Sequence, residues 1–167
     1  VLAALDLLAS GHLSRALIVD CDVHQGNGTA SMLADVPEIT TFSMHGASNY
    51  PLDKEASDVD VPLPDGTNDN VYLSLLDDHL GRLLNPAEAL PDLVLYQCGV
   101  DVLATDKLGK LSLSMAGCME RDRLVFERCA GQGIPMVCAM GGGYSPNVNT
   151  VVKAHVNTFR AALDAWI

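Results

Sequence analysis

The sequence lacks the uninterrupted apolar run of about 18 residues that a membrane-spanning helix requires. Its opening residues also lack the basic segment that begins a secretory signal peptide. Basic side chains are few, with 10 Lys and Arg against 21 Asp and Glu and a formal net charge of −11. Because a nucleic-acid backbone binds to a basic face, we do not expect a nucleic acid as a partner. The missing apolar run likewise leads us to expect no membrane partner.

Cysteine is scarce, and its spacing shows no pairs. The 5 cysteines are an odd number, which predicts reduced thiols and a cytoplasmic location. Low-complexity tracts are absent and hydrophobic residues make up 49%, so we expect a folded chain. A length of 167 residues fits one domain with a core of its own. The chain begins at Val1 inside a helical pattern, and we expect it to be part of a longer protein.

Strand patterns alternate with helix patterns along the chain. Runs rich in branched residues predict strands at 15–22, 39–45, 92–99 and 134–140, with a short edge strand at 58–64. Apolar periodicity and capping residues predict helices at 1–10, 26–35, 67–84, 114–130 and 145–167. This order predicts an α/β fold with a mainly parallel sheet that is covered by helices on both faces.

The stretch "LIVDCDVHQGNG" places polar side chains at alternate positions after an apolar run. Asp20, Asp22 and His24 would point to one face if the strand continued through them. Two carboxylates and an imidazole on one face are costly unless a cation lies between them. The pattern therefore indicates a cation site.

Other strands also end in polar residues. Asp101 follows the third core strand, and "GGGY", which ends in Tyr144, follows the fourth. Ligands of open parallel sheets bind beyond the carboxyl ends of the strands, so we expect these side chains to meet Asp22 and His24. One histidine and two aspartates suit zinc with an open coordination position, and also suit iron(II), manganese or cobalt. Taken singly, each residue also fits a structural role in a turn, a loop or a helix cap.

Three motifs then carry a family resemblance. "DCDVHQGNG", "YQCGVDVLATDKLGKLSLS" and "MGGGY" resemble, in this order and spacing, the C-terminal part of the histone deacetylase superfamily. The form with Gln25 and Asn27 is most similar to class IV and bacterial members. The resemblance covers nearly the whole chain. It implies the arginase–deacetylase three-layer α/β/α sandwich, with residues 1–167 forming the C-terminal part of one catalytic domain whose N-terminal part is missing.

The resemblance also implies a role for each matching residue. Asp22, His24 and Asp101 match zinc ligands, and Tyr144 matches a tyrosine that donates a hydrogen bond to the substrate carbonyl. Further matches are implied for a structural potassium or sodium site, for a contact to a catalytic histidine and for the substrate tunnel. These are Asp20, Ser43 and Met44 for the cation site, Asn27 for the histidine contact, and Gly141, Gly142 and Gly143 for the tunnel.

The resemblance implies a zinc-dependent deacetylase that removes acetyl or other acyl groups from lysine in proteins or from a related small amine. The family uses two adjacent histidines as general base and acid, whereas the 5 histidines of this chain are all separate. We therefore expect an incomplete catalytic domain, with part of its sheet edge exposed. Two alternatives remain open: another metallohydrolase of the same fold, or a chain that binds an acetylated ligand without hydrolysing it.

Overall fold

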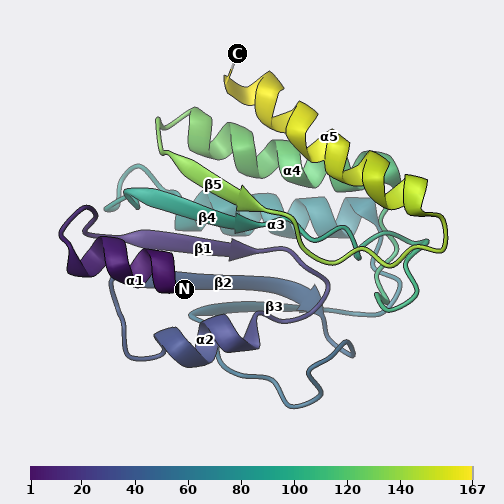
Figure 1. Ribbon diagram of the computed structural model, residues 1–167, viewed down its shortest axis with the longest axis horizontal. Coiled ribbons are helices and arrows are strands. Elements are labelled where there is room, and N and C mark those ends of the chain that lie inside the picture. Colours follow the sequence, from purple (N-terminus) through teal and green to yellow (C-terminus); the bar gives the residue numbers. More distant parts are fainter. Residues whose placement is uncertain (167) are drawn as a thin grey trace.

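The computed structural model describes residues 1–166, and within this range five parallel strands form one sheet in the order β3-β2-β1-β4-β5 (Figure 1). The strands are β1 (Ala16–Asp20), β2 (Ile39–Gly46), β3 (Val59–Leu63), β4 (Leu93–Gln97) and β5 (Met136–Ala139). The helices are α1 (Leu2–Ala9), α2 (Asn27–Leu33), α3 (Asp69–Leu83), α4 (Met115–Ala130) and α5 (Val148–Trp166). The predicted α/β class and the parallel sheet are confirmed.

Helices cover both faces of the sheet and produce three layers. In Figure 1, α1 and α2 lie on one face, and α3, α4 and α5 lie on the other. The central strand β1 is covered on both faces, because all five of its residues are buried. Leu17 and Val19 pack into the core beneath α3 to α5, while Ala16 and Ile18 pack into a second core beneath α1. Alternate side chains thus face opposite layers, as expected for a parallel strand that is buried on both sides.

Capping residues fix where several helices begin. The Ser114 hydroxyl accepts a hydrogen bond from the Gly117 amide at 3.0 Å, which confirms the predicted start of α4. The predicted start of α5 at Ser145 and Pro146 is wrong by a few residues. The helix begins at Val148, because the Asn147 side chain accepts the Asn149 amide at 3.0 Å and so provides the cap.

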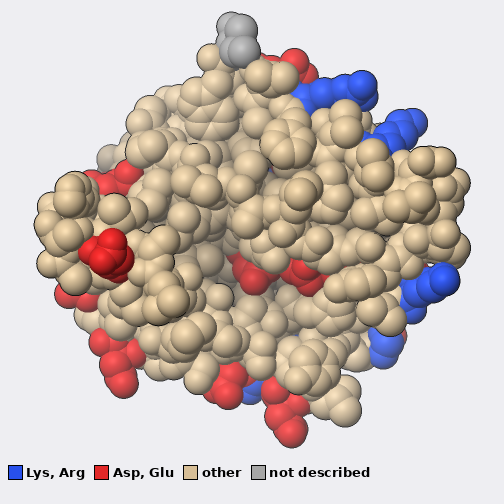
Figure 2. Space-filling model, in the orientation of Figure 1, with Lys and Arg blue, Asp and Glu red and all other residues tan. Residues whose placement is uncertain are grey.

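The strands β3 and β5 form the two edges of the sheet, and the edge at β5 is bordered by an apolar surface. This strand pairs with β4 only, and Val137 in it is 57% exposed. Beside it, α5 presents exposed apolar residues on one face, spaced three or four positions apart. They are Val148, Val152, Val156, Phe159 and Leu163. Figure 2, in the same orientation, shows a broad area with few charged side chains here. The predicted exposure of a sheet edge is therefore observed.

Among residues 1–166, no helix is both long enough and apolar enough to span a bilayer.

The inner face of α3 supplies a test of this packing. Leu80 is fully buried in the core, whereas Val71 on the same helix is 49% exposed. We expect Leu80→Ala to lower the free energy of unfolding by about 2–5 kcal/mol, because it leaves a cavity. Val71→Ala is the matched control and should change it by less than about 0.5 kcal/mol. Urea unfolding followed by circular dichroism measures both, and equal effects would contradict the assigned face of α3.

Candidate metal centre

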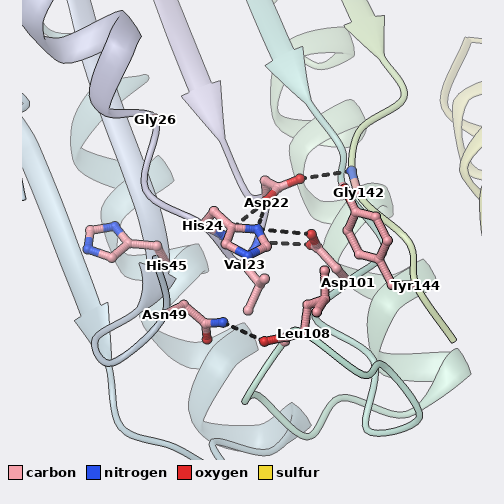
Figure 3. Close-up of polar contacts among 12 residues, drawn as sticks. Asp22, Val23, His24, Gly26, His45, Asn49, Asp101, Leu108, Gly142 and Tyr144 are labelled. Carbon is pink, nitrogen blue, oxygen red and sulfur yellow. Dashed lines mark hydrogen bonds and ion pairs between the residues drawn. The ribbon is translucent and has the colours of Figure 1, made fainter. Parts of the chain in front are cut away.

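The candidate site lies beyond the carboxyl ends of β1 and β4, which are neighbours in the sheet. Asp22 and His24 come from the segment after β1, and Asp101 comes from the segment after β4. One potential ligand atom from each residue lies within 4.8 Å of the others. Figure 3 shows the three side chains pointing toward one another. The structure thus brings together the three residues that the sequence analysis named as metal ligands.

The local backbone differs from the expectation of one continued strand. β1 ends at Asp20, so the predicted end of this strand at Asp22 is wrong, and both Asp22 and His24 follow the strand. The Asp20 carboxylate accepts the Asp22 amide at 3.0 Å, and the Asp22 carboxylate accepts the His24 amide at 3.0 Å. Each bond joins a side chain to the amide two residues later, as in an Asx turn. Two successive turns of this kind take the chain off the sheet and direct His24 toward Asp101.

The imidazole of His24 lies between the two carboxylates. Its Nδ1 atom is 3.0 Å from Asp22 Oδ1 and 3.2 Å from Asp101 Oδ2. The other oxygens of these carboxylates are held by backbone amides: Asp101 Oδ1 accepts Val23 N–H at 2.9 Å and Asp22 Oδ2 accepts Gly142 N–H at 2.9 Å. Asp101 is fully buried, and its Oδ2 atom has no hydrogen-bond partner. A buried carboxylate oxygen of this kind is the group that a bound cation would satisfy.

Glycines allow the backbone to approach these carboxylates closely. A Cβ atom on Gly99 or Gly142 would overlap the carboxylate of Asp22 or Asp101, respectively. A Cβ atom on Gly141 would lie 2.9 Å from Asp22 Oδ2. Gly143, in contrast, packs against Val100 and Val151 and is not next to either carboxylate. The roles of Gly141, Gly142 and Gly143 in a substrate tunnel stay a prediction.

Burial and mutual repulsion separate the pKa values of the carboxyl groups. Burial raises the pKa of Asp101 to about 7, and the nearby charge of Asp22 adds to the rise. Burial likewise raises the pKa of Asp20 to about 7. Burial opposes ionisation of Asp22 as well, but hydrogen bonds from the His24 and Gly142 amides lower its pKa below the ordinary value. A divalent cation would favour the ionised form of all three groups.

The residues predicted for the monovalent-cation site lie on the β2 side of this centre. Asp20 and Ser43 are partners in the register of β1 and β2. The Ser43 hydroxyl accepts the Gly26 amide at 3.3 Å and lies 3.0 Å from His45 Nδ1. Met44 is buried in the core, so its side chain serves packing. Asn27 is the first residue of α2. The cation site and the contact of Asn27 to a catalytic histidine stay predictions.

Tyr144 lies at the edge of an open pocket beside the three ligands. The pocket has a volume of about 570 Å³, and its lining includes His24, Tyr50, Leu108 and Tyr144. Tyr144 is 48% exposed, and its backbone amide donates to the Asp106 carboxylate at 2.6 Å. Figure 3 shows the ring beside Gly142 and Asp101. The arrangement places a phenol and a possible metal site at one opening.

Comparison with known proteins decides the family. Residues 1–159 match the family described as "Histone deacetylase domain". The chain belongs to the histone deacetylase family. It is 46% identical over 156 residues to an uncharacterized protein of Picosynechococcus sp. (strain ATCC 27264 / PCC 7002 / PR-6), covering 93% of this chain and 51% of the relative. It is 35% identical over 143 residues to histone deacetylase 2 of Arabidopsis thaliana, covering 84% of this chain and 36% of the relative.

Solved structures show the same fold for this deacetylase-family chain. An acetylpolyamine aminohydrolase from Burkholderia pseudomallei superposes with a TM-score of 0.79 at 22% identity, covering 98% of this chain and 49% of that one. A histone deacetylase homologue from Aquifex aeolicus superposes with a TM-score of 0.76 at 24% identity, covering 95% and 44%. The expected arginase–deacetylase fold is confirmed. The chain spans about half the length, or less, of each of these four proteins.

Sequence reasoning missed several residues that organise this deacetylase-family site. Arg121 and Asp122 in α4 are fully buried directly behind it, and Asp106 accepts hydrogen bonds from three amides in the loops around Tyr144. The sequence pattern of α4 did contain a signal for Arg121 and Asp122. Arg121 and Asp122 fall on the buried face of α4 between Cys118 and Val125, where an amphipathic helix normally carries apolar residues.

The raised pKa of Asp101 predicts a pH effect on the metal-free protein. Its carboxyl titrates near 7 when folded and near its ordinary 3.8 when unfolded, so folding is opposed increasingly as pH rises from about 4 to about 7. Asp101→Asn keeps an oxygen that accepts the Val23 amide but does not ionise. We expect the stability of the variant, relative to the wild type, to increase between pH 5 and 7.5. Urea midpoints in the presence of a chelator measure this difference, and a pH-independent difference would contradict the shift.

Proposed function

We propose that this chain is part of a zinc-dependent deacetylase that hydrolyses the amide of an acetylated amine. Membership of the family supports the reaction class. The observation that carries the metal dependence is the buried Oδ2 atom of Asp101, which accepts no hydrogen bond and lies within 4.8 Å of ligand atoms of Asp22 and His24. Iron(II) or another divalent ion fits the same donors, since imidazole and carboxylate groups do not select zinc alone.

The donor set fits a catalytic metal better than a structural one. Three protein ligands leave a coordination position for water or substrate. When bound, the metal supplies polarisation of the substrate carbonyl and a lower pKa for a coordinated water molecule. The chain's own contribution is to hold Asp22 through Gly142 N–H, and Asp101 through Val23 N–H, in fixed positions. His24 contributes Nδ1 from between the two carboxylates.

Tyr144 serves as a hydrogen-bond donor in this proposal. Its phenol lies at the opening of the pocket beside the metal ligands, and negative charge develops on the amide oxygen during hydrolysis. One donor directed at such an oxygen is typically worth about 3–4 kcal/mol of the activation barrier. The hydrogen bond from the Tyr144 amide to the Asp106 carboxylate limits the movement of the loop that carries Tyr144.

The proposed substrates are acetyl-lysine in a protein or an acetylated small amine. The open pocket beside His24 is bordered by Tyr50 and Leu108, whose apolar surfaces suit the methylene chain of such a substrate. Two of the similar proteins are named as a histone deacetylase and as an acetylpolyamine aminohydrolase, which supports this range of amines. The net charge of −11 favours cationic substrates over anionic ones. The five free cysteines support a reducing, cytoplasmic setting.

We also propose that residues 1–167 form the C-terminal part of one catalytic domain. The five histidines in this sequence are all separate, so the proposed pair of adjacent catalytic histidines would come from the remaining part of the domain. The open edge of β5 and the apolar face of α5 are the surfaces that this part would cover. An exposed strand edge next to an apolar helix face is favourable only when another segment packs there.

Metal binding tests the centre directly. After dialysis against zinc, we expect about one tightly bound ion per chain, as for a site with three protein ligands. His24→Ala and Asp101→Asn should each lose the ion, because each removes a ligand atom. His12→Ala is the matched control, because His12 is exposed in the loop before β1. Elemental analysis measures the metal content, and zinc retained by both site variants would contradict the proposed centre.

Reconstitution tests the reaction and the domain assignment together. The part of the Picosynechococcus relative that lies outside the matched segment is added to this chain as a separate polypeptide. We expect the two to associate and to hydrolyse an acetyl-lysine peptide or an acetylated polyamine. Tyr144→Phe should lower kcat by about 10²–10³-fold at unchanged zinc content, because one hydrogen-bond donor is lost. A zinc-loaded complex that is inactive on both substrates would contradict the proposed function.

A further inference from the structure

A buried ion pair lies directly behind the candidate metal centre. Arg121 and Asp122 are adjacent in α4, and neither is exposed to solvent. Asp122 Oδ1 accepts hydrogen bonds from Arg121 Nε at 2.9 Å and Nη2 at 2.7 Å. Buried pairs of this kind contribute little net stability compared with well-packed apolar residues. Their presence on the apolar face of a helix therefore calls for another explanation.

The third nitrogen of the guanidinium, Nη1, does not contact Asp122 and instead connects the two segments that carry the proposed metal ligands. Arg121 Nη1 donates to the Gly99 carbonyl at 2.6 Å and to the Cys21 carbonyl at 3.1 Å. Cys21 immediately precedes Asp22, and Gly99 lies two residues before Asp101. One nitrogen atom thus binds the backbone of both segments.

Movement of one segment would be transmitted to the ligands of the other. The hydrogen-bond ladder between β1 and β4 reaches only to the bond from the Cys21 amide to the Gln97 carbonyl. A Cβ atom on Gly99 would lie 3.0 Å from the Cα atom of Asp22, so the two segments are already in close contact. A shift at Gly99 would therefore change the position of Asp22 relative to Asp101.

The orientation of Arg121 is itself fixed from two further elements. Asp122 Oδ1 also accepts the Tyr96 hydroxyl of β4 at 2.6 Å, and Asp122 Oδ2 accepts the Thr158 hydroxyl of α5 at 2.6 Å. These bonds leave the guanidinium little freedom to rotate. Groups that hold metal ligands from behind typically change metal affinity by about 10–100-fold when they are altered.

We propose that Arg121 is a positioning residue of the metal centre: by binding the Cys21 and Gly99 carbonyls together, it sets the separation of the two ligand-bearing segments and hence the metal affinity. This inference depends on the proposed function, because it requires that the centre binds a metal.

A lysine substitution tests the role of the guanidinium fork. Arg121→Lys keeps the charge opposite Asp122, but one ammonium does not reproduce the planar fork that reaches both the carboxylate and the two carbonyls. We expect the zinc dissociation constant, measured by competition with a chromogenic chelator, to rise by about 10–100-fold. The visible absorption of the cobalt(II)-substituted protein should also change, since it reports ligand geometry. Affinity and spectrum equal to those of the wild type would overturn the proposal.

Two control variants separate positioning from stability. Arg123→Lys lies two positions along the same helix, where the side chain pairs with Glu120 and Glu127 at the surface, and should leave zinc binding unchanged. Leu80→Ala lowers stability in the core beneath α3 without removing any bond of Arg121 or Asp122. It should lower the urea midpoint without a comparable loss of zinc affinity. If Leu80→Ala weakened zinc binding as much as Arg121→Lys at equal loss of stability, the role would be structural only.

A measurement on the wild type does not depend on a folded variant. If the bonds of Arg121 favour metal binding, the metal must favour those bonds by the same free energy. Zinc should therefore slow hydrogen exchange at the Arg121 guanidinium, observed by NMR, and leave that of Arg123 unaffected. Unchanged exchange at Arg121 with zinc bound would overturn the inference alone, whereas a wild type that binds no zinc would overturn the proposed function as well.

Discussion

The confinement of acidic side chains at the ends of β1 and β4 is the constraint on which the site depends. Asp22 and Asp101 approach the same imidazole nitrogen, and Asp101 is fully buried. A buried carboxyl group beside a second carboxylate is unfavourable in a metal-free protein: burial first, and then the charge of Asp22, raises the pKa of Asp101. The fold tolerates it by directing backbone amides at both oxygens of Asp22 and at Oδ1 of Asp101, while Oδ2 of Asp101 accepts none.

The rest of the molecule holds this arrangement in place. Parallel pairing aligns the ends of β1 and β4, and the glycines at 99 and 142 allow neighbouring segments to approach the carboxylates without steric overlap. From behind, α4 contributes Arg121 to the backbone of both ligand-bearing segments. The site is therefore supported by backbone contacts from several elements, which is the kind of support that a metal centre with little freedom of movement requires.

Family membership and local geometry contribute different parts of the functional argument. The family match and the relatives indicate the class of reaction, whereas the identity and arrangement of donors in this chain indicate where a metal would bind. The open side at β5 and α5 adds a third observation, because a large apolar surface beside an unpaired strand edge favours packing with further protein. Together with the coverage of about half of the first relative's length, it supports the proposal that this chain shares a domain with another segment.

The sequence alone determined the alternation of strands and helices, because hydrophobic periodicity depends on neighbouring residues. It also named Asp22, His24 and Asp101 as possible ligands, since side-chain chemistry does not depend on the fold. The tertiary structure decided that β1 stops at Asp20 and that two turns, not a strand, direct His24 toward Asp101. It also decided that Arg121 lies behind the site, because contacts between residues one hundred positions apart are set by packing and not by local pattern.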